Sequence, residues 1–187
     1  MNLSIEMIRK AVNYCIKKHW NQRRKVGGSF YFWHPIRVAS CVNDFLEYIG
    51  IKDSDVIVAA LLHDVVEDTD TSFEEIEKEF GKRVATIVSY LTGEGKGLEK
   101  KRKIVNKLKN APLEVKIIKM CDAYDNLLDF VYSLKKFGNR IWDKFNTDRE
   151  GFIWYYNTIL KILRNNEKIK GYFLLSEIEK LTKIFHL

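Results

Sequence analysis

The sequence predicts an all-α protein folded as one domain, and three observations lead to this prediction. Only two prolines and ten glycines occur among 187 residues, so few positions interrupt a helix. No stretch sustains the two-residue alternation of a half-buried strand, whereas apolar residues recur at three- and four-residue steps. A hydrophobic content of 46% is enough for a full core and excludes a disordered chain. We therefore expect residues 1–187 to form a single compact helical bundle.

Capping and turn signals place the elements in order. Apolar residues form one stripe over residues 3–19, which predicts an amphipathic first helix. The Gly27-Gly28 pair indicates a loop, and Pro35 suits the first turn of the following helix, which ends at Gly50. The expected elements are helices over 3–19, 35–48, from Ser54 through His63 and Asp64, from the capping boxes at Thr71-Ser72 to Phe80-Gly81, and over 82–92, 98–109, 112–136, 140–165 and 169–185, with a loop over 23–33.

A polar motif, His63-Asp64-Val65-Val66-Glu67-Asp68, gives the strongest indication of function. It follows Ala59-Ala60-Leu61-Leu62 directly, so its charged residues interrupt an apolar helix. Buried groups of this kind need partners or a metal ion. On a continuous helix, His63 and Glu67 would be neighbours at i,i+4, and so would Asp64 and Asp68. An isolated His-Asp pair is also compatible with a capped surface helix, but the apolar context favours a site.

Two further residues, His34 and Asp122, complete a possible set of metal ligands with the His63-Asp64 pair. Two imidazoles and two carboxylates suit Mn²⁺, Fe²⁺ or Zn²⁺, with positions left for water or phosphate. Such an ion would lower the pKa of a water molecule and offset phosphate charge, while an outer carboxylate orients or deprotonates that water. We assign this catalytic role to the Glu67-Asp68 pair.

Several motifs in a fixed order carry a resemblance to a known family. They are His34-Pro35, His63-Asp64-Val65-Val66-Glu67-Asp68-Thr69, Phe80-Gly81, Lys119-Met120-Cys121-Asp122 and Asn126-Leu127. From about Arg23 to Asp129 the chain resembles the hydrolase domain of RelA/SpoT-type proteins, in particular the stand-alone small alarmone hydrolases of the HD superfamily. The resemblance implies an HD-type domain that uses one Mn²⁺ per chain to remove the 3′-pyrophosphate of (p)ppGpp. Because 187 residues are too few for the synthetase domain of the long members, only this degradative reaction is expected.

Candidate substrate contacts follow from the resemblance and from helix geometry. Arg24 and Lys25 match the family's Arg-Lys pair, which implies stacking on the base and contacts with phosphates. Lys119, Asp122 and Asn126 recur at three- and four-residue steps and share one face of a helix. Lys119 is therefore a further candidate for the substrate site. Asn126, one turn beyond Asp122, could hydrogen-bond a base or sugar.

Some features allow two interpretations. Tyr31 aligns with a pocket-lining tyrosine of the family, but it could equally be a core aromatic. Tyr155 or Tyr156 could stack on the substrate, although core packing is the better explanation. The net charge of +7 is concentrated between Gly95 and Lys109, either as a solvated helix face or as an electropositive rim that attracts an anionic nucleotide. No motif for binding DNA or RNA is present, so we expect a small nucleotide as the partner.

The segment Asp122-Ala123-Tyr124-Asp125-Asn126 departs from the family pattern, which is Asp-Arg-Leu-His-Asn or Asp-Lys-Leu-Tyr-Asn. A basic residue is lost at Ala123, an acid replaces the aromatic or imidazole at Asp125, and Leu128 stands where an arginine is usual. Substrate identity is therefore less secure than the chemistry. The alternatives are another nucleotide, such as the 2′-phosphate of NADPH or an adenine alarmone, and a non-catalytic nucleotide-binding regulator. The presence of the Glu67-Asp68 pair argues against the regulator.

The cysteine pattern indicates a reducing compartment. Cys15, Cys41 and Cys121 are scattered through expected helices without a CxxC motif, so we expect reduced core residues in a cytoplasmic protein. Cys121 is better explained as a packing residue than as a nucleophile. The chain has no apolar run of transmembrane length, and its start lacks the order of a signal peptide, so no membrane association is expected. The oligomeric state stays open.

Overall fold

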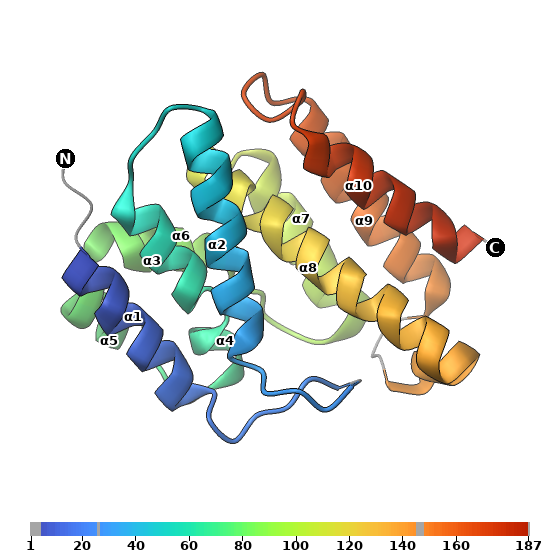
Figure 1. The fold of residues 1–187 in the computed structure, drawn as a ribbon, viewed down its shortest axis with the longest axis horizontal. Coiled ribbons are helices and arrows are strands. Elements are labelled where there is room, and N and C mark those ends of the chain that lie inside the picture. The colour runs from blue at the N-terminus through green and yellow to red at the C-terminus, as the bar shows by residue number, and fades with distance from the viewer. Residues whose placement is uncertain (1–4, 26, 145–147, 187) are drawn as a thin grey trace.

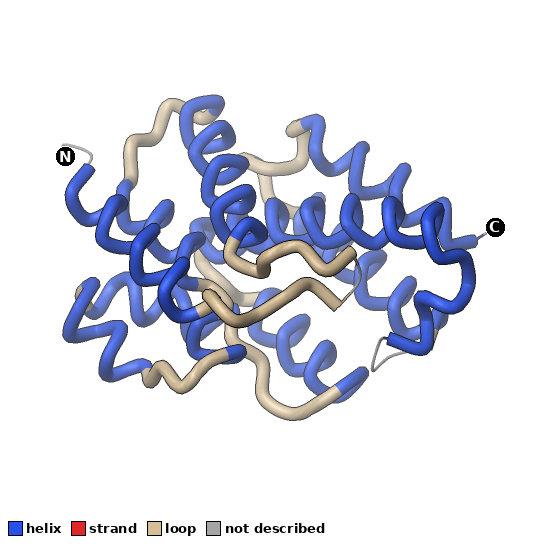
Figure 2. Tube along the Cα trace, turned by 60° about the horizontal axis from the view of Figure 1, so that its bottom comes forward, coloured by secondary structure: helices blue, strands red, loops and turns tan. Residues whose placement is uncertain are grey.

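The computed structural model describes residues 5–25, 27–144 and 148–186, and within these ranges it confirms the all-α prediction (Figures 1 and 2). One isolated antiparallel bridge joins Arg23 and Phe30. The α-helices are α1 Ile5–Lys18, α2 Trp33–Tyr48, α3 Ser54–Leu62, α4 Val65–Asp68, α5 Phe73–Phe80, α6 Lys82–Leu91, α7 Gly97–Lys109, α8 Leu113–Phe137, α9 Arg149–Arg164 and α10 Phe173–Lys183, with 3₁₀ segments η1 Gly138–Lys144 and η2 Ile184–His186.

Helix α3 lies at the centre of the packing and contacts α1, α2, α6 and α8. Every residue from Ser54 to Leu62 except Asp55 is buried, as expected for a helix that is apolar on nearly all sides. The long helix α8 also packs against α2, and α10 packs against both α8 and α9 (Figure 1). Helix α7, in turn, contacts α9. This arrangement brings α2, the end of α3 and α8 to one place. None of the described helices is long and apolar enough to cross a membrane.

The expected helix through His63 and Asp64 is interrupted at these two residues. Helix α3 ends at Leu62, His63 and Asp64 form a turn, and α4 begins at Val65. The cause is local: His63 Nδ1 donates to the Ala60 carbonyl at 2.7 Å. In a continuous helix that carbonyl would accept from the N–H of residue 64. The backbone N–H of Asp68 still donates to the Asp64 carbonyl at 2.9 Å, so these two residues remain one turn apart.

The C-terminal helices begin later than expected. The predicted helix over 140–165 is wrong at its start, because η1 ends at Lys144 and α9 begins at Arg149. The side chain of Asp148 caps α9 by accepting from the N–H of Gly151 at 2.8 Å. Residues 145–147 of the predicted helix lie outside the described part. The predicted helix over 169–185 also begins later, at Phe173, after a turn in which the N–H of Tyr172 donates to the Ile169 carbonyl.

Candidate active site

The four predicted metal ligands lie together where α2, the α3–α4 turn and α8 meet. His34 Nε2 is 3.3 Å from Asp122 Oδ1 and 3.6 Å from Asp64 Oδ2. His63 Nε2 is 3.1 Å from Asp64 Oδ2 and 3.8 Å from Asp122 Oδ1. Ligand atoms of His34, His63 and Asp122 all lie within 4.8 Å of one another. His34 and Asp122 are 88 positions apart in the chain, yet the fold brings them together in one small volume.

The two histidines each have one nitrogen engaged and one unpaired. His34 Nδ1 lies 2.6 Å from Asp125 Oδ2, and His63 Nδ1 donates to the Ala60 carbonyl. Both Nε2 atoms are buried and have no hydrogen-bond partner within the described part of the chain. A buried polar atom without a partner is costly. Two such nitrogens facing two carboxylates match the donors that a divalent cation requires, so the residues present fit a metal ion.

Charges around this centre also favour a cation. Burial alone would raise the pKa of Asp122, but Lys119, His34 and His63 hold it well below its usual range. Burial likewise opposes ionisation of Asp64, yet His63 in particular keeps the pKa of that carboxyl low. Conversely, these carboxylates raise the pKa of His63 well above its usual value despite its burial. The centre therefore holds ionised carboxylates that stabilise positive charge.

Tyr31 connects the loop before α2 to this centre. Its hydroxyl donates to Asp64 Oδ2 at 2.6 Å, and its ring lies 5.8 Å from the His34 ring. It also lines the adjoining cavities. Burial, together with Asp64, raises the pKa of the phenol well above its usual value, so the hydroxyl stays protonated and remains a donor. Tyr31 is thus a pocket residue that also packs against the metal centre.

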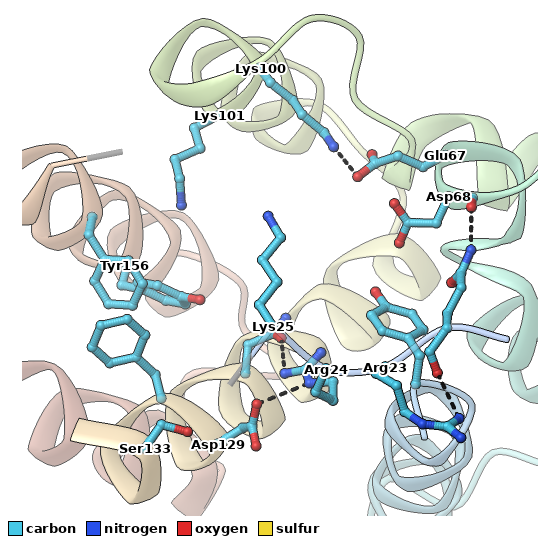
Figure 3. Close-up of a pocket in the computed structure, with 15 residues that line it drawn as sticks. Arg23, Arg24, Lys25, Glu67, Asp68, Lys100, Lys101, Asp129, Ser133 and Tyr156 are labelled. Atoms are coloured by element: carbon cyan, nitrogen blue, oxygen red, sulfur yellow. Dashed lines mark hydrogen bonds and ion pairs between the residues drawn. The ribbon is translucent and has the colours of Figure 1, made fainter. Parts of the chain in front are cut away.

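The predicted catalytic acids, Glu67 and Asp68, stand side by side on one wall of the cavity (Figure 3). Glu67 accepts from the backbone N–H of Gly93 at 2.9 Å and forms an ion pair with Lys100. Burial, with the nearby charges of Asp64 and Glu67, raises the pKa of Asp68 to about 6. A carboxylate with such a pKa is ionised at neutral pH and still accepts a proton readily.

Two adjoining cavities, of about 470 and 240 Å³, extend from the metal centre. The smaller cavity is lined by His63, Asp64 and Asp122, and the larger one is lined by Arg24 and Asp129. They share one set of lining residues: Lys25, Tyr31, Glu67, Lys100, Lys101, Asn126, Phe152 and Tyr156. One continuous pocket therefore joins the metal centre to a region rich in lysine.

Arg24 binds α8 in this structure. Its Nε donates to Asp129 Oδ2 at 3.0 Å, and its Nη2 donates to Asn126 Oδ1 at 2.8 Å. Asn126 donates its own amide to Asp122 Oδ1. Arg24 also lies 5.5 Å from the centre of the Tyr31 ring. The lead-in loop is thus connected to a metal-ligand candidate through Arg24 and Asn126, a link in addition to the base and phosphate contacts that the resemblance implies.

Lys100 and Lys101 were not singled out in the sequence. Figure 3 shows Lys25 and Lys101 extending toward the open centre, while Lys100 turns to Glu67. Lys101 lies 4.1 Å from the Tyr155 ring centre, and burial, with a contribution from Lys119, lowers its pKa to about 8. The basic run from Gly95 to Lys109 was the only available signal, and it does not identify which of its side chains face the pocket.

Asp125 and Arg37 were also missed as parts of the site. Arg37 donates to Asp125 through Nε at 2.6 Å and through Nη2 at 2.9 Å, and Asp125 in turn contacts His34. In the sequence, Asp125 stood out only as a departure from the family pattern. Its position three residues after Asp122 gave no indication of the α2 contact. Tyr155 and Tyr156 are buried and also line the smaller cavity, so they combine core packing with pocket lining.

Comparisons with known proteins agree with this geometry. Residues 11–130 match the HD domain family. Guanosine-3′,5′-bis(diphosphate) 3′-pyrophosphohydrolase MESH1 of Danio rerio is 42% identical over 130 residues, which cover 67% of this chain and 70% of the relative. The protein of the same name from Xenopus tropicalis is 33% identical over 174 residues, which cover 91% and 93%. A solved structure of a metazoan SpoT orthologue that hydrolyses ppGpp superposes with a TM-score of 0.78 at 30% identity, covering 96% of this chain and 97% of that one.

Proposed function

Because this chain belongs to the HD-domain family, in the group that contains the stand-alone guanosine-3′,5′-bis(diphosphate) 3′-pyrophosphohydrolases, we propose that it removes the 3′-pyrophosphate of ppGpp or pppGpp. The products are GDP or GTP and pyrophosphate. The observation that carries the proposal is the pair of buried, unpaired imidazole nitrogens facing two carboxylates at the end of a lysine-lined pocket. A pocket of this kind suits a nucleotide with phosphates at both ends of the ribose.

His34, His63, Asp64 and Asp122 would hold a divalent ion, and Mn²⁺ is the ion that we propose. Nitrogen and carboxylate donors also suit Fe²⁺ and Zn²⁺, so the identity of the metal is part of the test. When bound, the ion would supply Lewis-acid stabilisation of charge on phosphate and a more acidic water. Lys119 donates to Asp122 Oδ2 at 2.7 Å, which keeps that carboxylate oriented toward the histidines.

Glu67 and Asp68 manage the attacking water in this proposal. Asp68, with a pKa of about 6, accepts the proton from the water as its oxygen attacks phosphorus. The bond between phosphorus and the ribose 3′-oxygen breaks, and that oxygen takes up a proton from solvent water to complete the nucleoside diphosphate or triphosphate, while Asp68 returns its proton to solvent. Glu67 is held by Gly93 on one side, and it orients the water beside Asp68. Substrate phosphate would compete with Glu67 for Lys100.

The nucleotide occupies the larger part of the pocket. Lys25, Lys100 and Lys101 offset phosphate charge, and the Tyr31 ring provides an aromatic wall. Asn126 of α8, and Arg24, which donates to it from the loop before α2, lie where the sugar or base would contact them. The pocket is lined by lysines from the lead-in loop and from α7, whose positive charge would offset the charge of several phosphates. A small, highly anionic nucleotide is therefore the expected partner. We expect neither DNA nor RNA to bind.

The cysteines support the expected reducing compartment, and we propose the cytoplasm. All three are free thiols, with Cys15 and Cys121 buried. Burial raises the pKa of the Cys121 thiol well above its usual value. A thiol in that state is a poor nucleophile, which supports a packing role beside Asp122.

The direct test is turnover by metal-free protein to which Mn²⁺ is added. The substrates are ppGpp, its adenine counterpart and NADPH, and the readout is the release of pyrophosphate or orthophosphate together with the nucleotide product. We expect pyrophosphate and GDP from ppGpp, with weaker hydrolysis of the adenine counterpart. If the protein instead preferred to release orthophosphate from NADPH, its substrate would be the 2′-phosphate of NADPH and not the alarmone. Tight nucleotide binding without any product would instead indicate a regulator.

A further inference from the structure

Asp125 of α8 faces α2 and is not among the described residues that line the two cavities. Its Oδ2 lies 2.6 Å from His34 Nδ1, and it is buried. Arg37 binds both of its carboxylate oxygens, through Nε at 2.6 Å and through Nη2 at 2.9 Å. The acid that departs from the family pattern therefore contacts a candidate metal ligand at Nδ1, the ring nitrogen opposite the one that faces Asp122.

This contact fixes which nitrogen of His34 carries the proton. An ionised carboxylate can only accept hydrogen bonds, so Nδ1 must be the donor. In the neutral ring Nε2 then keeps its lone pair, and it is this atom that lies 3.3 Å from Asp122 without a hydrogen-bond partner among the described residues. A neutral imidazole with a free Nε2 lone pair is the form that binds a divalent ion.

Arg37 offsets the free-energy cost of burying the Asp125 carboxylate. Asp125 lies three residues beyond Asp122, so an uncompensated charge at Asp125 would be costly. The guanidinium fork binds the carboxylate in two places, a geometry that also fixes its orientation. Since Arg37 follows His34 by three residues on α2, one helix presents both the ligand and the cation that holds its support.

We propose that Asp125, held by Arg37, is a positioning residue that sets the tautomer of His34 and strengthens its Nε2 as a metal donor. The proposal rests on the metal site of the proposed function and adds two residues to it. The two histidines then differ in kind, because His63 donates to the neutral Ala60 carbonyl whereas His34 donates to a carboxylate. A charged acceptor behind the ring holds the Nδ1–H more firmly and fixes the orientation of Nε2 as a ligand atom.

The first test measures Mn²⁺ affinity of the metal-free protein by competition with a chelator. Asp125→Asn should weaken binding by about ten- to a hundredfold, the usual effect of losing such a support. Arg37→Gln should act in the same direction but less, and it is a safe second variant because Arg37 is half exposed. Asp44→Asn is the matched control: it removes a carboxylate from an exposed position of α2 and should leave the affinity unchanged.

The second test separates positioning from a merely structural role. In the double variant, Arg37→Gln should add little to Asp125→Asn, because Arg37 acts through Asp125. Nitrogen-15 NMR of the metal-free protein should show His34 protonated at Nδ1. In Asp125→Asn the signal should move toward the Nε2-protonated form, because the new amide can donate to Nδ1. A structural role would lower the unfolding temperature without moving this equilibrium.

The outcomes distinguish the two proposals. Unchanged Mn²⁺ affinity and an unchanged tautomer in Asp125→Asn, with metal still bound by the wild type, would overturn the positioning role alone. A wild type that binds Mn²⁺ but hydrolyses no alarmone would overturn the proposed substrate and leave the positioning role standing. A wild type that binds no divalent ion would overturn the metal site and, with it, the role of Asp125.

Discussion

The two ends of the pocket are built differently. At the metal end, His34, His63 and Asp122 are 1%, 3% and 5% exposed, and each has a fixed neighbour on a core helix. At the nucleotide end, Lys25 comes from a loop and Lys100 and Lys101 come from α7, all with long side chains around an open space (Figure 3). Rigid burial suits chemistry that needs fixed geometry, whereas adaptable cations suit the binding of a flexible polyphosphate.

The largest expected effect comes from removing a ligand at the metal end. His63→Ala should remove most bound metal and abolish hydrolysis, because it takes away one of the three residues whose candidate ligand atoms lie within 4.8 Å of one another. Elemental analysis and a turnover assay measure the two effects, and circular dichroism should show that the helices remain. Full metal occupancy in this variant would exclude His63 as a ligand. It would also contradict the view that the metal end depends on a fixed set of donors.

The second effect tests whether chemistry can be separated from metal binding. Glu67→Gln and Asp68→Asn keep the shape of the wall but remove the charge, so each should lower kcat by on the order of 10²–10⁴. Metal content should stay at the wild-type level. Glu74→Gln, an exposed position on α5, is the matched control and should leave kcat unchanged. Near-normal turnover in both wall variants would contradict a role in activating water.

A smaller effect is expected where the two ends are connected. Arg24→Ala removes two charged hydrogen bonds to α8 and leaves Asn126 free to turn away from Asp122. We expect kcat/KM to fall by about ten- to a hundredfold, mostly through KM. Steady-state kinetics with ppGpp measures the split. An equal fall of kcat with unchanged KM would show that Arg24 serves the metal end instead.

The smallest effect is a pH dependence at the nucleotide end. The pKa of Lys101 is lowered to about 8 by burial, so the side chain is cationic below that pH and becomes neutral above it. Attraction for phosphate is therefore complete at pH 7 and is lost as the pH rises through 8. We expect a fall of about two- to fivefold in kcat/KM, because Lys101 is one of several lysines that line the pocket.

The profiles of two variants check this assignment. Lys101→Arg keeps its charge and should remove the fall above pH 8, whereas Lys103→Arg, at an exposed position of the same helix, should retain it. An identical decline in all three proteins would place the titrating group elsewhere.

The metal end was accessible to sequence reasoning because its ligands interrupt apolar helices. His63 and Asp122 are polar positions within buried segments, and that contrast is visible in the sequence. The break in the helix after Leu62 is not visible in the sequence, because it depends on a hydrogen bond from the His63 imidazole to the Ala60 carbonyl. The start of α9 at Arg149 was missed for a similar reason, because it depends on the side chain of Asp148, which caps the helix by accepting from the N–H of Gly151.

The nucleotide end was less accessible because its residues depend on how helices pack. Lys100 and Lys101 stand in a run of similar residues, and only the contacts of α7 with α6 and α9 decide which side chains face the pocket. The same holds for Asp125, whose partners on α2 are about 90 positions away in the chain. A substitution that weakens a family match can thus carry a function of its own.

Gly93 lies against both α4 and α7. It lies in the segment between α6 and α7, and its N–H holds Glu67. A Cβ atom at this position would lie 2.7 Å from Ile104 Cδ1 and 2.9 Å from Lys100 Cγ. Ile104 is buried, so a side chain at residue 93 would force the side chains of Ile104 and Lys100 to shift. The absence of a side chain at residue 93 therefore lets α7 pack closely enough for Lys100 to pair with Glu67, and we expect a substitution at this position to disturb that pairing.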